Sequence, residues 1–151
     1  MTDVGERSAH AFHEAGHAVV AIAMNKIKVL DILLDGTGGT TNVKWSEGMN
    51  FEKLCFYIAG EMTECLYSEK YYSEQHCWSD RVYTQTVLFL ISHDRNEQYK
   101  FWILAIKKVR EIFEDPKNVI LLNKIAAVLM VKDVLTEDEI NAMVNDGEVE
   151  V

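Results

Sequence analysis

Two histidines and a glutamate lie close together near the start of the chain, where residues 12–17 read F-H-E-A-G-H. If this stretch is helical, His13 and His17 lie one turn apart on the same face, so two imidazoles can bind one cation. Glu14 can then reach a water bound to that cation. In zinc metallopeptidases this H-E-x-x-H pattern combines a zinc-bound water of pKa about 7 with a carboxylate base. The pattern predicts His13 and His17 as metal ligands and Glu14 as the catalytic general base.

A hydrolytic zinc site needs a third protein ligand and leaves the fourth position to water. The metzincin continuation is absent, because residues 18–24 contain no histidine. The downstream residues with suitable donor atoms are Glu61, Glu64, His76, Cys77 and Asp80. Their spacing does not choose among them. It also leaves open that the two histidines are hydrogen-bonded core residues, and that Asp80 only complements a helix dipole.

The elements that must position these residues follow from the apolar pattern. Residues 8–24 contain good helix formers and an apolar stripe, so the histidines are expected on a helix. Gly16 on that helix would let another element approach closely. Residues 27–34 and 40–45 are expected to form a β-hairpin around a glycine-rich turn. That turn precedes no helix and no G-K-[ST] sequence, so it is not a phosphate-binding loop.

The rest of the chain is expected to be mostly helical. A helix is predicted from Asn50 to about residue 68, followed by an irregular loop over residues 70–78. Ser79 is predicted to cap a helix over 80–92, and further helices are predicted over 96–114 and 118–130. The sequence T-E-D-E at 136–139 is a capping box for a last helix to about residue 144. The sequence therefore predicts a mainly α, α+β domain with one small β-hairpin.

The bulk composition indicates one globular domain over residues 1–151, with a frayed tail from about residue 146. The chain is 48% hydrophobic and 26% charged, and its net charge of −9 argues against nucleic acid as a partner. The longest apolar run, residues 18–24, is too short to span a bilayer, and the N-terminus does not have the pattern of a signal peptide. Three cysteines without C-x-x-C spacing favour reduced thiols in the cytoplasm.

Four blocks of the sequence resemble a known family. The sequence A-F-H-E-A-G-H-A-V-V-A at 11–21 resembles the active-site helix in the peptidase domain of the FtsH family of ATP-dependent zinc metalloproteases. Three later blocks are similar to that domain in the same order: I-A-G-E-M-T-E-C-L at 58–66, C-W-S-D-R-V with T-Q-T at 77–86, and V-L-T-E-D-E-I at 134–140. Together they span most of the chain.

The resemblance implies a compact helical, zincin-type metallopeptidase domain. It implies Asp80 as the third zinc ligand beside His13 and His17, and Glu64 as a group that orients a ligand histidine. Two departures are that Glu61 replaces an arginine of the family and Cys65 replaces a glutamate. In addition, residues 76–77 replace small residues, so a changed or supplementary ligand is an alternative.

The expected function is that of a zinc-dependent endopeptidase acting on unfolded or flexible polypeptides, with one Zn²⁺ per chain. FtsH proteases carry a membrane anchor and an ATPase module ahead of this domain. Neither is expected here, so the chain should have no ATPase activity of its own, and a separate unfoldase or a homo-oligomer is a candidate partner. The hairpin over 27–45 could pair with an extended substrate. The alternative is a non-catalytic zinc-binding module that binds a peptide or a partner protein.

Overall fold

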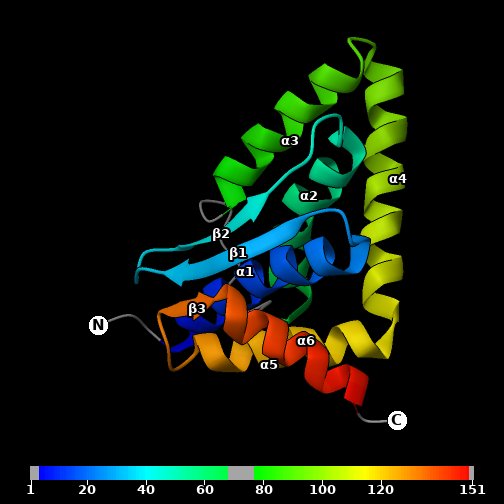
Figure 1. The fold of residues 1–151 in the computed structure, drawn as a ribbon. Coiled ribbons are helices and arrows are strands. Elements are labelled where there is room, and N and C mark those ends of the chain that lie inside the picture. The colour runs from blue at the N-terminus through cyan, green and yellow to red at the C-terminus, as the bar shows by residue number, and fades with distance from the viewer. Residues whose placement is uncertain (1–3, 68–76, 150–151) are drawn as a thin grey trace.

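The computed structural model describes residues 4–67 and 77–149. This part of the chain forms six helices and one three-stranded antiparallel sheet, in agreement with the predicted mainly helical α+β class (Figure 1). In chain order the elements are α1 (Val4–Met24), β1 (Lys28–Leu34), β2 (Gly39–Lys44), α2 (Asn50–Tyr67), α3 (Trp78–Ile91), α4 (Arg95–Glu114), α5 (Pro116–Leu129), β3 (Val134–Thr136) and α6 (Glu137–Val149).

Helix α1 is the central element, and it is buried on more than the one stripe that the sequence predicts. Every residue from 13 to 21 is buried, because α2, α5 and the sheet all pack against this helix. Many of its side chains are small, which lets neighbours approach on several sides. The predicted close approach at Gly16 is confirmed: a Cβ there would lie 2.2 Å from Thr63 Oγ1 and 3.0 Å from the Ala59 carbonyl oxygen.

The predicted hairpin is present, and a third strand joins it. β1 lies between β2 and β3 and is antiparallel to both. β3 was not predicted as a strand; it pairs Leu135 with Ile32, and both side chains are fully buried. Within the described residues, β2 pairs only with β1, so its outer edge is not hydrogen-bonded to another strand.

The helix boundaries are close to those predicted, with corrections at the start of α3 and at the end of α6. This helix begins at Trp78 with Cys77 at the N-cap position, and no side chain caps it. Ser79 therefore lies inside the first turn, and its predicted capping role is wrong. The capping box is confirmed, since the Thr136 hydroxyl and the Glu139 carboxylate bond each other's backbone N–H groups. Helix α6 continues to Val149, beyond the predicted end.

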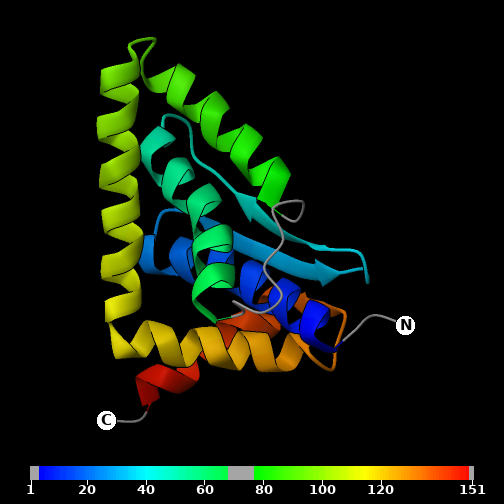
Figure 2. The same ribbon diagram turned by 180° about the vertical axis from the view of Figure 1, so that it is seen from behind.

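Helix α2 occupies the middle of the helical layer. It packs against α1 on one side and against α3 and α4 on the other, as the view from behind shows (Figure 2). This arrangement brings the first turn of α3 towards the H-E-x-x-H turn of α1. The predicted loop over residues 70–78 falls mostly outside the described part of the chain, as does His76. Over the ranges the structure describes, none of the helices has the length and apolar character needed to cross a bilayer.

Candidate metal centre

Three metal-binding atoms from two helices meet at one point. Nε2 of His13 and Nε2 of His17 lie 3.2 Å apart, and Oδ2 of Asp80 lies 2.7 Å and 2.9 Å from them. Ligand atoms around a tetrahedral zinc ion at the usual bond lengths are separated by about 3.3 Å. The three atoms therefore need to move apart by at most about 0.6 Å to bind one ion, and we call them the triad site.

The second nitrogen of each imidazole has an acceptor that fixes its proton. Nδ1 of His13 donates to the Glu64 carboxylate at 2.9 Å, and Nδ1 of His17 donates to the Phe56 carbonyl at 2.6 Å. A carbonyl oxygen can only accept, so the lone pair of His17 must be on Nε2, which faces the other two donor atoms. Converging lone pairs repel one another unless a cation lies between them. The triad site therefore favours a bound cation, either a proton or a metal ion.

The acid–base properties of the triad site agree with this arrangement. Burial lowers the pKa of His13, but its hydrogen bonds to Asp80, Cys77 and Glu64 outweigh burial and raise that pKa well above its usual value. Burial also lowers the pKa of His17, but the charge of Asp80, its hydrogen bond and the charge of Glu14 together outweigh burial, so this pKa is raised as well. Burial raises the pKa of Asp80, but the two imidazoles together lower it by more than burial raises it. The pKa of Asp80 is therefore lowered.

Space for the two imidazoles is provided by a glycine that the sequence analysis did not select. A Cβ on Gly60 of α2 would lie 2.4 Å from Nε2 of His17 and 2.6 Å from Nε2 of His13. The Phe56 carbonyl, one turn earlier on α2, was also missed. A glycine inside a helix costs about 1 kcal/mol relative to alanine, and this cost was the available sequence signal for Gly60. The backbone acceptor at Phe56 has no sequence signal, because every residue carries a carbonyl.

Glu14 faces the sheet beside the triad site. Its carboxylate accepts a hydrogen bond from the Thr41 hydroxyl on β2 at 2.9 Å, and that hydroxyl also contacts the Glu14 carbonyl oxygen at 3.0 Å. Gly39 lets the strand pass close by, since a Cβ there would lie 2.7 Å from Cγ of Glu14. Thr41 is a further contact that the sequence analysis missed. Strand β2 thus holds the carboxylate in place.

The triad site opens into a cleft of about 800 Å³. Its lining comes from β2 and the turn before it, from α1 and α2, and from the start of α3. His13, Glu14, His17 and Asp80 all line this cleft. The buried metal-binding atoms are therefore reachable from solvent along the free edge of β2.

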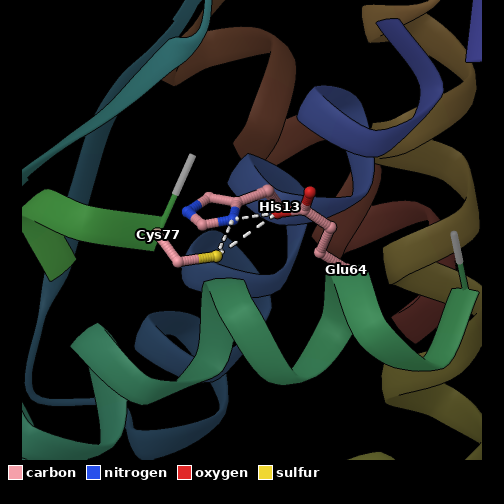
Figure 3. A group of neighbouring side chains, drawn as sticks. All are labelled: His13, Glu64 and Cys77. Atoms are coloured by element: carbon pink, nitrogen blue, oxygen red, sulfur yellow. Dashed lines mark hydrogen bonds and ion pairs between the residues drawn. The ribbon is translucent and has the colours of Figure 1, made fainter. Parts of the chain in front are cut away.

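The remaining candidate ligands have other partners. Glu61 contacts Arg81 and does not reach the triad site. Glu64 and Cys77 are close to the other side of the His13 ring: the Cys77 thiol lies 3.6 Å from Oε2 of Glu64 and 4.0 Å from Nδ1 of His13 (Figure 3). Burial raises the pKa of Cys77 to about 11, so this group is a thiol that donates to Glu64 at neutral pH.

Comparison with known proteins does not assign the chain to a family. The chain matches no model of a known protein family, and no curated protein is significantly similar to it. What the site can do is therefore argued from its geometry. The described residues include two groups that could hold a metal ion: His13/His17/Asp80, in which Asp80 is half-buried, and His13/Glu64/Cys77, which is wholly buried.

Proposed function

We propose that this chain is a zinc-dependent endopeptidase that hydrolyses unfolded or flexible polypeptides. The observation that carries the proposal is the convergence of three donor atoms within 3.2 Å, two of them on buried histidines, next to a carboxylate in the same cleft. Two imidazoles and one carboxylate are a known catalytic zinc set, and they leave one coordination position for water.

The proposal also draws on the sequence resemblance to the FtsH peptidase domain. Under this proposal, Asp80 is the third ligand that the resemblance implies, and it is the candidate that lies against both histidines. Glu64 contacts His13 in the manner of a group that orients a ligand ring. A separate unfoldase would then supply unfolded chains to the cleft, and a homo-oligomer is the other candidate assembly.

When bound, zinc would supply Lewis-acid chemistry, namely a water of lowered pKa and polarisation of the substrate carbonyl. The protein groups have distinct tasks around it. His13, His17 and Asp80 would hold the ion, and Glu64 and the Phe56 carbonyl orient the two rings by accepting hydrogen bonds from their Nδ1 atoms.

Glu14 is the proposed general base for the attacking water. Its carboxylate accepts the proton of the attacking water and can return it to the leaving amine. The Thr41 hydroxyl donates to Oε1 of this carboxylate, which restrains its rotation and leaves the second oxygen for the water. Thr41 is therefore a positioning residue in this mechanism.

The substrate class follows from the shape of the cleft. The free edge of β2 lines it, and an extended peptide can add to such an edge through main-chain hydrogen bonds. Main-chain pairing requires an extended segment, and it depends little on which side chains that segment carries. Folded substrates are excluded by this mode, and unfolded chains of varied sequence are accepted.

The test is the replacement Glu14→Gln. Glutamine is nearly isosteric and can still accept from Thr41, but it cannot take a proton at neutral pH. Zinc content, measured by elemental analysis, should be unchanged, and casein cleavage should fall by about 100-fold or more. Added ATP should have no effect on the parent or the variant.

The matched control is Glu61→Gln, which removes a carboxylate that contacts Arg81 outside the triad site and should leave cleavage unchanged. Equal activity in the parent and Glu14→Gln would trace the cleavage to a contaminating protease. An inactive parent with full zinc content, tried on several unfolded substrates, would favour the alternative of a non-catalytic zinc-binding module.

A further inference from the structure

A second set of metal-binding atoms lies on the face of His13 that points away from the triad site. It consists of Nδ1 of His13, Oε2 of Glu64 and Sγ of Cys77, contributed by α1, α2 and the start of α3 (Figure 3). None of these atoms belongs to the set that binds the proposed catalytic ion, which uses Nε2 of His13. The two sets meet only through the imidazole ring.

The separations within this second set suit a tetrahedral ion. They are 2.9 Å from nitrogen to oxygen, 3.6 Å from sulfur to oxygen and 4.0 Å from sulfur to nitrogen. Zinc with its usual bond lengths places nitrogen and oxygen ligands about 3.3 Å apart, and sulfur about 3.6 Å from either. Each separation is within about half an ångström of these values, so small side-chain rotations are sufficient.

The burial of these three groups and the thiol among them determine which metal ions they can bind. Glu64 and Cys77 are completely buried, and His13 is nearly so. A buried carboxylate needs strong partners, and a carboxylate can supply one or both oxygens to an ion. A thiolate is a soft donor that selects zinc, cadmium or cobalt over magnesium and calcium.

We propose that His13 Nδ1, Glu64 and Cys77 form a second metal site, for a thiophilic divalent cation such as zinc or cadmium, and that the His13 imidazole bridges it to the triad site. Binding displaces the Cys77 thiol proton and the His13 Nδ1 proton, and both are released to solvent. The bridging ring is then an imidazolate that uses one nitrogen for each ion.

The second ion would join three helices at the position where α3 begins. Cys77 is the N-cap residue of α3, and Asp80 lies in the first turn of the same helix. An ion on Cys77 therefore restrains the backbone that carries the third ligand of the triad site. The second site is thus a structural support for the first, and it rests on its own donor atoms whether or not the chain is a peptidase.

The experiment is a titration of the metal-stripped protein with cobalt(II), followed by absorbance. The parent should bind two equivalents and develop the near-ultraviolet charge-transfer band that only thiolate–cobalt bonds produce. Cys77→Ser should bind one equivalent without that band, because serine keeps the hydrogen bond to Glu64 but is a poor ligand. The matched control is Cys55→Ser, the other buried cysteine, which should keep both equivalents and the band.

A second variant separates the two sites. His17→Ala removes a ligand of the triad site only, so it should bind one equivalent and retain the thiolate band. Absence of the band in the parent, or its persistence in Cys77→Ser, would overturn the proposal. A single equivalent in the parent would overturn the bridging arrangement. Loss of peptidase activity has no bearing on these spectra, so failure of the proposed function would be recognised separately.

Discussion

At the scale of the residue, His13 is the group on which both metal sets depend. One of its ring nitrogens faces Asp80 and His17, and the other faces Glu64 and Cys77. The ring is buried, so its orientation is set by these contacts and by the space available on α2. That space exists because residue 60 has no side chain.

We predict that Gly60→Ala will weaken metal binding without unfolding the protein. The new Cβ would lie within 2.6 Å of both Nε2 atoms, so at least one ring must rotate away from the ion. Alanine itself favours a helix by about 1 kcal/mol relative to glycine, which offsets part of the crowding. Zinc affinity, measured by competition with a chelator, should fall by about 10-fold to 100-fold.

The control for this prediction is Gly38→Ala, because a Cβ on Gly38 has no neighbour within 4 Å. It should bind zinc like the parent. If Gly60→Ala also bound zinc like the parent, the two imidazoles would have room to spare and the triad geometry described above would be incorrect.

At the scale of the element, the contact between α1 and α2 positions the histidines over Phe56 and Gly60. The two helices approach closely at Gly16, where the Thr63 hydroxyl and the Ala59 carbonyl fill the space of the missing side chain. Thr63 donates to the Ala59 carbonyl at 2.6 Å, so its hydroxyl is satisfied and cannot easily move aside.

We predict that Gly16→Ala will destabilise the fold. A Cβ would lie 2.2 Å from Thr63 Oγ1 and 2.6 Å from its Cβ, and relief requires the helices to separate. Overpacking of this kind costs about 1–3 kcal/mol, although alanine favours the helix itself. Chemical denaturation should show this loss in the free energy of unfolding, and a value equal to that of the parent would mean that α1 and α2 can separate freely.

At the scale of the whole molecule, the triad site joins segments that are distant in the chain. His13 and Asp80 are 67 residues apart, and α3 packs mainly on α2, which in turn packs on α1. An ion bound there is a cross-link of the native state that the unfolded chain lacks. Metal binding and folding are therefore coupled.

We predict that zinc will raise the melting temperature and that chelation will lower it. A free zinc concentration 1,000 times the dissociation constant adds about 4 kcal/mol, which corresponds to roughly 10 °C for a domain of this size. Calorimetry with and without zinc measures the shift. Asp80→Ala should remove the part of this shift that comes from the triad site, whereas Asp146→Ala on the exposed face of α6 should leave the whole shift intact.

The parts of this protein that the sequence alone determined are local in origin. The spacing of His13 and His17 sets two imidazoles on one face of any helix, because four residues span about one turn. The capping box at Thr136 and Glu139 and the hairpin around the glycine-rich turn depend likewise on neighbouring residues. These features needed no knowledge of how the elements pack.

Tertiary packing decided the rest. Glu61, Glu64, Cys77 and Asp80 all carry suitable donor atoms, and only the placement of α2 and α3 against α1 shows which of them meet the histidines. Strand β3 exists because the chain returns past β1 after α5, and a three-residue segment has no stable extended form without such a partner. Distances across tens of residues depend on the summed packing of whole helices, so no local pattern in the sequence encodes them.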